Sequence, residues 1–500
     1  MFRILSQPVT VKYGFSLTFS AVLRDNMSLK LVKDGRAIMT PNISIKLPLF
    51  SMPLTVFAIA VFVFAIDSQF CAGQESVAQQ EQPKPVTASS WVDFKNASEN
   101  VLMFHTGDRL EKDIIAGDVD RDGDVDILIA RKAAYGRKGA KTNMLLINDG
   151  GKLFDRTAEH VPGFLTPDDA RDIALFDANN DGWLDVIVVT TSGEQPRLFI
   201  NRTMGQADES DDLDKEVWLG FEEKKNWYSP AFNPGPKFRA VAAGDVSGDG
   251  YQDLFFVDYE NSLEDRLLIN DGTGKFTDET LLRMTPEMAE SNFGTQAIIA
   301  DWNYDGVNDI LKLTTDAQPQ AIRLLINDPN NEGNFAAFQD LPFHETYTIE
   351  AADFNNDGRL DLYAVSDDVD YIIWNKSSNT DGTINVSLTN VESKRTDRHG
   401  GNSHAWDIDG DGLSDIGVSN ADSRVAYLKN RAGKSLFDPN DDKSLAWNTM
   451  YTHDFCWVDI NKDGMIDIFV ATSEGYVFFL QDPPERGSRA KKDNSSKPKQ

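Results

Sequence analysis

A nine-residue pattern that recurs seven times constrains the fold of this chain more than any other feature. Each copy has Asp at positions 1, 5 and 9, an Asp, Asn or Ser at position 3, and Gly at position 6. The copies begin at Asp118, Asp177, Asp245, Asp301, Asp353, Asp407 and Asp459. Steps of 52 to 68 residues separate them, which is typical of an array of similar supersecondary units. The repeat therefore outweighs the usual expectation that a chain of this length divides into about three domains.

Each copy of the pattern lies between short apolar runs. In the first unit these runs are residues 114–117, 127–129 and 144–148, and the third run ends in Asn in several units. A turn such as Asp-Gly-Thr-Gly at 271–274 then leads to an aromatic residue. Short β-branched and aromatic runs separated by Gly, Asn and Asp indicate strands joined by turns. We therefore predict an all-β fold, a seven-bladed β-propeller of four-stranded antiparallel blades with the repeated loop in a hairpin of each blade.

The two ends of the repeat region predict how the ring closes. The last unit stops after residues 476–480 and lacks a fourth, aromatic-bearing strand. A spare segment, residues 90–94, precedes the first unit. Pairing the two would hide edges that could otherwise join other chains. We expect the N-terminal strand to complete the last blade, so that the propeller spans 91–482.

The repeated loops carry the oxygen ligands that a hard cation such as Ca²⁺ prefers, with a glycine for the sharp turn. An EF-hand would need an acidic residue at position 12 and helices on both sides, but position 12 is never acidic in the seven copies. Position 9 must then close the site. The alternative is that the loops are acidic turns without metal, since Asp and Asn favour turns. The candidate side-chain ligands at positions 1, 3, 5 and 9 are Asp118, Asp120, Asp122, Asp126, Asp177, Asn179, Asp181, Asp185, Asp245, Ser247, Asp249, Asp253, Asp301, Asn303, Asp305, Asp309, Asp353, Asn355, Asp357, Asp361, Asp407, Asp409, Asp411, Asp415, Asp459, Asn461, Asp463 and Asp467.

These loops resemble the FG-GAP/VCBS repeats of integrin α-subunit propellers and of bacterial secreted proteins, over residues 91–482. The Phe-Gly and Gly-Ala-Pro signatures are mostly missing, so the chain is more similar to the bacterial VCBS type, and an integrin-like adhesive role is in doubt. The resemblance implies up to seven Ca²⁺ ions, each bound by the side chains above and by the main-chain carbonyl at position 7. Those position-7 residues are Asp124, Trp183, Tyr251, Val307, Arg359, Leu413 and Met465.

Charge and cysteine content exclude some classes of function. The net charge is −30, and the acid is concentrated in the repeated loops. No basic stripe exists outside the C-terminal tail, which disfavours nucleic acid as a partner. The two cysteines, Cys71 and Cys456, cannot form a disulfide framework.

The segments outside the repeats predict export. Residues 1–73 read as a leader, in which residues 47–66 are uncharged and follow a positive flank. This is the pattern of a secretory signal, with cleavage after Gly73 or Ala78. The alternative is an uncleaved membrane anchor, since about 20 apolar residues can span a bilayer. We expect a secreted, periplasmic or cell-surface protein. Residues 74–90 are predicted to be a flexible linker, and residues 483–500 a disordered basic tail.

Candidate ligand-binding residues lie shortly before several of the loops: Arg171, Arg239, His404 and His453. If the first strand of each blade lines a central channel, these side chains gather at its mouth. The alternative is that they are hydrogen-bonded turn residues around a polar channel. The insertion at 202–237 places Trp218, Phe221, Trp227 and Tyr228 beside an acidic run. It would suit sugar stacking, or it would simply cover a blade edge.

Two functions fit the sequence. The first is an exported calcium-binding propeller that binds a glycan or a cell-surface protein as a monomer, with structural calcium and with membrane contact only if the leader is uncleaved. The second is a calcium-dependent polysaccharide lyase or hydrolase with its site at the channel mouth. The sequence has no nucleophile elbow, His-Glu-x-x-His zinc motif or phosphate loop, so no catalytic residue is assigned.

Overall fold

The structure of the chain is a computed structural model that divides into two compact units, Met1–Ala78 and Gln79–Gln500. It describes the backbone of four strands in the first unit and most of the second unit. The described residues are 8–11, 15–22, 26–33, 36–37 and 91–482, apart from 133–139, 206–215, 261, 316–320, 344, 367–368, 378–381, 393–400, 421–422, 432–435, 440–441 and 446–450.

The first unit contains an antiparallel four-stranded sheet within the predicted leader. Its strands, in sheet order, are β1 (Pro8–Val11), β2 (Phe15–Val22), β3 (Asn26–Lys33) and β4 (Arg36–Ala37). The apolar run 47–66, the linker 74–90 and the tail 483–500 lie outside the described residues, so their roles stay predictions. Among the residues that the structure describes, no helix is both long and apolar enough to span a bilayer.

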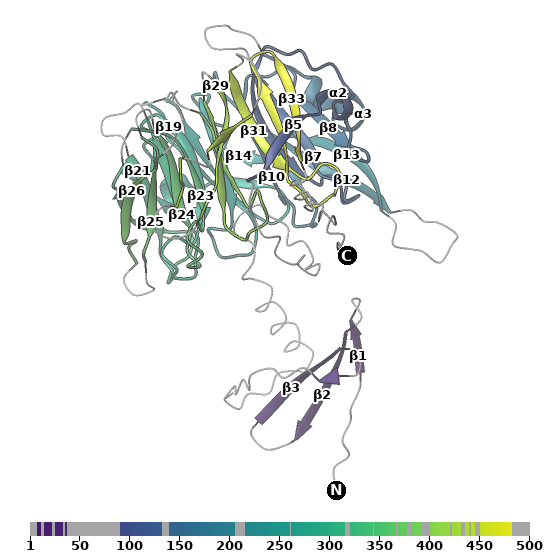
Figure 1. The fold of residues 1–500 in the computed structure, drawn as a ribbon. Helices are drawn as coiled ribbons and strands as arrows, with labels where there is room; N and C mark the ends of the chain where they lie inside the picture. The colour runs from purple at the N-terminus through teal and green to yellow at the C-terminus, as the bar shows by residue number, and fades with distance from the viewer. Residues whose placement is uncertain are drawn as a thin grey trace, which may run out of the picture. The chain divides into compact units, whose positions relative to one another are not determined.

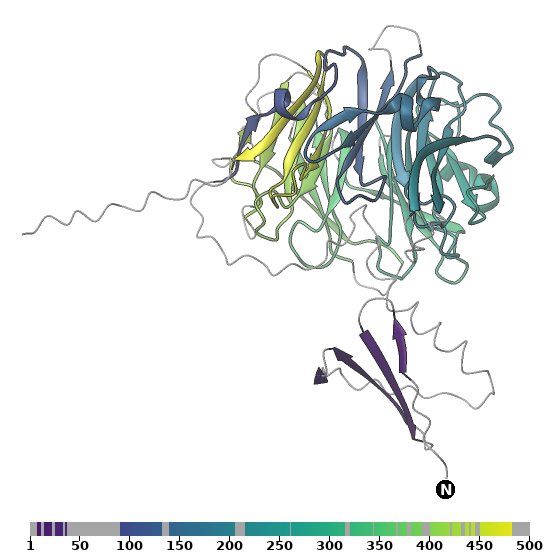
Figure 2. The same cartoon turned by 90° about the vertical axis from the view of Figure 1, so that its right-hand side faces the viewer.

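The second unit is a seven-bladed β-propeller, as predicted (Figure 1, Figure 2). Blades 1 to 3 are β6 (Glu111–Gly117), β7 (Asp126–Lys132), β8 (Met144–Asn148) and β9 (Leu153–Asp155); β10 (Ala170–Phe176), β11 (Asp185–Thr190), β12 (Arg197–Gly205) and β13 (Glu216–Lys224); and β15 (Phe238–Gly244), β16 (Asp253–Asp258), β17 (Arg266–Asn270) and β18 (Phe276–Asp278). Blades 4 to 6 are β19 (Gly294–Ala300), β20 (Asp309–Thr314), β21 (Ala321–Asn327) and β22 (Phe335–Leu341); β23 (Thr346–Ala352), β24 (Asp361–Ser366), β25 (Tyr371–Asn375) and β26 (Val386–Asn390); and β27 (Ser403–Trp406), β28 (Asp415–Asn420), β29 (Ser423–Leu428) and β30 (Lys443–Ser444). Blade 7 is β31 (Thr452–Val458), β32 (Asp467–Thr472), β33 (Gly475–Asp482) and β5 (Asp93–Asn96).

The first strand of each blade faces the centre of the ring. Each of these inner strands lies beside the inner strand of the next blade, and β31 lies beside β6. The second strands are largely buried, and β11 and β32 are buried along their whole length. A blade packs against a neighbour on both faces, and this explains why the second strands are continuous apolar runs rather than alternating ones.

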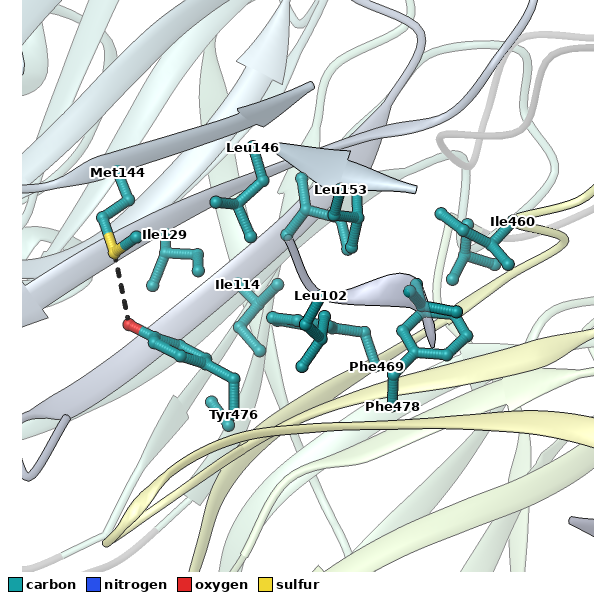
Figure 3. Packing of buried hydrophobic residues seen from close by; sticks show 14 of the residues in the cluster. Leu102, Ile114, Ile129, Met144, Leu146, Leu153, Ile460, Phe469, Tyr476 and Phe478 are labelled. Atoms are coloured by element: carbon teal, nitrogen blue, oxygen red, sulfur yellow. Dashed lines mark hydrogen bonds between the residues drawn. The ribbon is translucent and has the colours of Figure 1, made fainter. Parts of the chain in front are cut away.

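The ring closes as predicted, because the N-terminal strand β5 pairs antiparallel with β33 and completes blade 7. A cluster of buried side chains holds the closing blades together (Figure 3). In it, Leu102 and Ile114 of the first blade region pack with Phe469 and Phe478 of blade 7. The Tyr476 hydroxyl donates to the Asp108 carboxylate at 2.9 Å, and its oxygen lies 3.6 Å from the Met144 sulfur across the same junction. This pairing leaves blade 7 with four strands like its neighbours.

Blade 3 departs from the prediction of four strands. The short strand β14 (Tyr228–Ser229), which comes from the long insertion, pairs parallel with β18 and makes a fifth strand. The described helices are single turns outside the sheets: α2 (Ser98–Val101), α3 (Thr157–His160), the 3₁₀ turn η1 (Pro162–Leu165), α4 (Thr280–Arg283) and α5 (Pro286–Ala289).

Candidate functional site

The seven repeated loops have one common geometry, and each joins the first two strands of its blade. The residue before position 1 always pairs with the position-9 Asp, as Gly117 pairs with Asp126 and Val458 with Asp467. Strands and not helices flank every loop, which agrees with the argument that these loops are not EF-hands. Position 6 is a glycine with φ between 81° and 99° in all seven loops, which a side chain would strain.

Position 4 also has a positive φ in every loop, and the sequence analysis missed it. Five of the seven residues there carry side chains. The position-4 residues are Arg121, Asn180, Gly248, Tyr304, Asn356, Gly410 and Lys462, with φ from 56° to 74°. The left-handed region costs little for Asn or Gly but more for Tyr or Arg. The loop must therefore be held by strong contacts from elsewhere.

Carboxylates hold the turn through backbone N–H groups. In every loop the position-1 carboxylate accepts from the Gly N–H at position 6, at 2.7–3.0 Å. The position-5 carboxylate accepts from the N–H at position 7, at 2.7–3.2 Å. These bonds are those of acidic turns, which the alternative interpretation of the loops as turns without metal requires. In loops 2 to 7 the second oxygen of the position-1 carboxylate also accepts a backbone N–H, from position 5 or, in loop 3, from position 4.

The first and sixth loops bring three carboxylates together. Carboxylate oxygens of Asp118, Asp120 and Asp126 all lie within 4.8 Å of one another, and so do those of the corresponding trio in loop 6, Asp407, Asp409 and Asp415. Burial, with a smaller contribution from the charge of Asp120, raises the pKa of Asp126 to about 8. Like charges at this range repel, which a divalent cation would relieve.

The remaining polar atoms of the loops also fit Ca²⁺. The buried Ser247 hydroxyl oxygen has no hydrogen-bond partner within the described part of the chain. One carboxylate oxygen of Asp409 is likewise buried without a partner there. Both stand at position 3. Buried polar atoms are normally hydrogen-bonded, so a buried loop oxygen without a partner is what an ion-binding loop would contain.

The position-9 Asp has a second role, in fixing the third strand of its own blade. These seven side chains are at most 1% exposed. One oxygen of each accepts the backbone N–H of an amide residue at or near the end of the third strand, at 2.7–2.9 Å. We call these residues the bridging amides: Asn148, Asn201, Asn270, Asn327, Asn375, Asn430 and Gln481.

The bridging amides connect each blade to the preceding one. The side-chain N–H₂ of each donates to the carbonyl of position 2 in the preceding blade's loop, at 2.7–3.3 Å. The bond from Asn148 to Ile460 joins blade 1 to blade 7, so the bonds form a closed ring. The sequence shows the recurring Asn at the end of the third run. Its role is not visible there, because the bond joins two different blades.

A cavity of about 1020 Å³ opens along the inner strands, and it contains all four candidate ligand-binding residues. Arg171, Arg239, His404 and His453 line it, from blades 2, 3, 6 and 7 respectively. Arg171, Arg239 and His453 each lie six residues before their loops, which is roughly 20 Å along a strand. The structure therefore brings the four together in one cavity, with Arg171, Arg239 and His453 at the opposite end of their inner strands from the repeated loops, whereas His404 lies three residues before its loop.

A β-bulge recurs at the point where the cavity opens. The pairing of the first two strands skips one residue in blades 2, 3, 4, 5 and 7. The skipped residues are Arg171, Arg239, Thr295, Tyr347 and His453. A bulge inserts an extra residue and re-aims its side chain, and bulges are over-represented beside functional sites. The sequence pattern alone has no signal for these irregularities.

The residue that follows the bulge position carries a carboxyl group in several blades, and these carboxyl groups connect neighbouring blades. Asp454 accepts the N–H of Ile114 at 2.9 Å, and Asp172 accepts the N–H of Val241 at 2.8 Å. Asp113 makes the same bond to blade 2 at 3.3 Å. Burial, then the charges of Asp172 and Asp454, raise the pKa of Asp113 well above its usual value. Burial also raises the pKa of Asp172 to about 6.

The pKa values of the two cavity histidines are shifted in opposite directions. Burial lowers the pKa of His453 to about 4, with a further contribution from Lys112, so His453 is neutral at pH 7. Its buried Nδ1 has no hydrogen-bond partner among the described residues. Burial would also lower the pKa of His404. The bond of its Nε2 to Asp454 at 3.2 Å outweighs burial, and the pKa of His404 is raised.

The insertion at 202–237 does not present the predicted aromatic surface. Phe221 and Trp227 are 5% and 3% exposed and belong to the cores between blades. Trp218 stacks on His160 at 4.4 Å and donates to the side-chain oxygen of Asn201 at 2.7 Å. The sugar-stacking interpretation is therefore wrong for Phe221 and Trp227, because the insertion covers blade edges. Its acidic run lies outside the described residues.

Comparisons with known proteins agree with this architecture. The sequence profile of the FG-GAP-like repeat matches residues 118–188 and 245–311. No curated protein sequence matches this chain.

Three solved structures are similar to this chain at low identity. A lectin from Agrocybe aegerita that recognises non-reducing terminal N-acetylglucosamine is 17% identical, over 73% of this chain and 86% of its own, with a TM-score of 0.41. The biofilm matrix protein Bap1 of V. cholerae is 10% identical over 79% of this chain and 92% of its own, with a TM-score of 0.38. The Photorhabdus luminescens Tc holotoxin pore is 13% identical over 71% of this chain and 18% of its own, with a TM-score of 0.35. The repeat match and the seven blades together identify residues 93–482 as a β-propeller built from FG-GAP-type repeats.

Proposed function

We propose that this protein is an exported binding module, in which Ca²⁺ stiffens the propeller and the channel cavity receives a glycan or protein ligand. One observation carries the proposal. A cavity of about 1020 Å³ is lined by charged and polar side chains from several blades, including Arg171, Arg239, His404 and His453. Concave sites with a few convergent polar groups are where proteins bind ligands.

Calcium in this proposal has a structural role. Ligand-type oxygens at positions 1, 3, 5 and 9, including the unpartnered oxygens of Ser247 and Asp409, would hold the ion. Because each position-9 Asp also anchors a bridging amide, an ion there would stiffen the junction between blades. Arg171, Arg239 and His453 lie roughly 20 Å along the strand from their loops, so an ion in those loops would not touch a ligand held by these side chains.

Export is supported by the sequence alone. The uncharged run 47–66 follows a positive flank and precedes small residues suited to cleavage. Extracellular Ca²⁺ would also keep low-affinity loops occupied.

A second function, a calcium-dependent polysaccharide lyase or hydrolase, is favoured by one observation. Asp113, whose pKa is raised well above its usual value by burial and by the charges of Asp172 and Asp454, lies against Asp172 in the cavity wall, and paired carboxyls with shifted pKa values can act as acid and base. However, each of these carboxyls already accepts a backbone N–H from the next blade, which gives it a structural role. Binding without turnover therefore fits the arrangement better.

Glycan-array binding followed by product analysis tests the proposal. The full chain in millimolar Ca²⁺ is applied to the array, and each bound glycan is then incubated with the protein and examined for shorter or unsaturated products. We expect binding, no products, and loss of binding in His453→Ala but not in the outer-hairpin control Arg202→Ala. Products that disappear in Asp113→Asn would establish the enzyme instead. Binding that His453→Ala leaves intact would place the ligand elsewhere.

A further inference from the structure

The sixth loop contacts a positive charge of the chain itself. The residue immediately before the bridging amide is apolar in six blades: Ile147, Ile200, Ile269, Ile326, Trp374 and Leu480. In blade 6 the same position is Lys429. Its ammonium donates to Oδ2 of Asp409 and, at 2.7 Å, to Oδ2 of Asp411. These two residues stand at positions 3 and 5, so Lys429 contacts two of the four candidate side-chain ligands of its loop.

Other cations near the loops are placed differently. Lys462 pairs with Asp124, which stands at position 7 and is expected to offer an ion only its carbonyl. Arg359 pairs with Asp357, a single candidate ligand of loop 5. Among the ion pairs between described residues, Lys429 alone joins two candidate ligands of one loop. Loop 6 is therefore the described loop in which a side-chain cation lies between ligands.

The surroundings of Lys429 shield its charge from water. Its side chain is 19% exposed, and its Nζ lies 5.0 Å from the centre of the Trp91 ring. Trp91 precedes the closing strand β5, and the Lys443 ammonium donates to the Trp91 carbonyl at 3.0 Å. Partly buried charge pairs are screened less than exposed pairs, which contribute little to stability. The two contacts of Lys429 should therefore stabilise loop 6 measurably.

A Ca²⁺ ion in loop 6 would compete with Lys429 for the same oxygens. Oδ1 of Asp411 accepts the N–H of Leu413 at 3.0 Å, and Oδ2 accepts the Lys429 ammonium. An ion bound through position 5 must displace one of these partners, and the ammonium is the partner that the ion repels. At position 3, Lys429 contacts Oδ2 of Asp409, whereas Oδ1 has no hydrogen-bond partner among the described residues. The ammonium and the ion are thus alternative ways to neutralise this loop.

We propose that Lys429 competes with Ca²⁺ at loop 6: its ammonium holds positions 3 and 5 together without the ion and weakens calcium binding at this loop. The inference rests on the calcium role in the proposed function. An apolar side chain at the same position of the other blades supplies no such charge. Blade 6, which contacts the closing segment through Lys443 and Trp91, then keeps its loop neutralised when Ca²⁺ is scarce.

Melting temperatures of Lys429→Met in EDTA and in millimolar Ca²⁺ test the inference on the full chain. Met keeps the apolar length of the side chain and removes its charge. In EDTA the variant should melt at a lower temperature than wild type, because Asp409 and Asp411 lose their cation and repel each other. In millimolar Ca²⁺ the deficit should shrink or reverse, because the ion binds the variant more tightly. Lys429→Arg, which keeps the charge, should melt like wild type in EDTA.

Calcium binding gives a second measurement. Equilibrium dialysis followed by elemental analysis counts the ions bound per chain over a range of free Ca²⁺. Because the ion no longer has to displace a charged hydrogen-bond donor, it should bind loop 6 at least about tenfold tighter in Lys429→Met. At free Ca²⁺ that fills loop 6 in the variant but not in wild type, the variant should carry about one ion more per chain.

The control is Lys225→Met, which removes an exposed ammonium that pairs with Glu223 of β13. It should change neither the calcium count nor the difference in melting temperature between EDTA and Ca²⁺. An equal deficit of Lys429→Met in both conditions would make Lys429 an ordinary ion pair, and a calcium count below wild type would make it a support of the ion. Either result overturns the inference while structural calcium stands. A wild-type chain that binds no calcium would instead remove structural calcium from the proposed function, and the competition with it.

Discussion

The bridging amides predict a large effect from a single buried side chain far from any ligand. Asn270 in blade 3 is 2% exposed. Its amide N–H₂ donates to the carbonyl of Ala178 in the blade 2 loop at 2.9 Å, and to that of Gln252 in its own loop at 3.0 Å. Its side-chain oxygen accepts the N–H of Gly272 at 3.1 Å. Asn270→Ala removes all three bonds at once.

The cost follows from these bonds. Each contributes about 1 kcal/mol net, and a buried group left without a partner costs about 1–3 kcal/mol. With two buried carbonyls orphaned, we expect Asn270→Ala to lower the free energy of unfolding by about 3–5 kcal/mol. A domain of roughly 390 residues unfolds with an entropy of about 0.8 kcal/mol/K, so the melting temperature should fall by about 4–6 °C.

Differential scanning calorimetry in millimolar Ca²⁺ measures this shift. The matched control is Asn330→Ala, an exposed Asn in a turn of blade 4 whose side chain donates to Asp328 of its own turn at 3.3 Å. It should shift the melting temperature by less than about 1 °C. Asn270→Asp should be at least as damaging as Asn270→Ala, because it sets an acceptor against two carbonyls. A melting temperature for Asn270→Ala within about 1 °C of wild type would refute the role of the bridging amides.

Three further predictions follow from other groups. Chelation with EDTA should lower the melting temperature markedly, since Ca²⁺ at 100 times its Kd would contribute about 2.7 kcal/mol per occupied loop; an unchanged melt would rule out structural calcium. Asp113 has a raised pKa, so its contribution to stability is complete below the unfolded pKa of about 3.9 and is lost as pH rises. Asp113→Asn should therefore flatten the melting temperature between pH 5 and 8, and an identical pH profile would contradict this. Lys312 and Asp265, which are 1% and 0% exposed, form a buried ion pair at 2.7 Å. Lys312→Met leaves the Asp265 charge unpaired and should lower the free energy of unfolding, measured by chemical denaturation, by about 3–5 kcal/mol. The exposed control Lys275→Met should lower it little.

The sequence was sufficient for the architecture because its information is local and repeated. Seven loops with Asp at positions 1, 5 and 9 and Gly at position 6 predicted seven hairpins, and the missing last strand predicted closure by residues 90–94. The preference of these residues for a turn depends on about ten consecutive residues, so the sequence alone contains all the information needed to predict the turn.

The candidate cavity was only partly predictable. Polar residues before the loops indicated a channel site, and Arg171, Arg239, His404 and His453 do line one cavity. The burial of Phe221 and Trp227 was not predicted, because an aromatic in an insertion has the same pattern whether it faces solvent or a neighbouring blade.

Only the tertiary structure decided the contacts between units that are distant in sequence. Asn148 meets Ile460, 312 positions away, and Asp454 meets Ile114, 340 positions away. The bulges that re-aim Arg171 and Arg239 arise in the pairing of two strands. A one-dimensional pattern records which residues recur, but which carbonyl an amide reaches depends on how the blades pack around the ring. The sequence by itself therefore determined the blade and its loop, and the closed ring determined the junctions between blades and the channel they enclose.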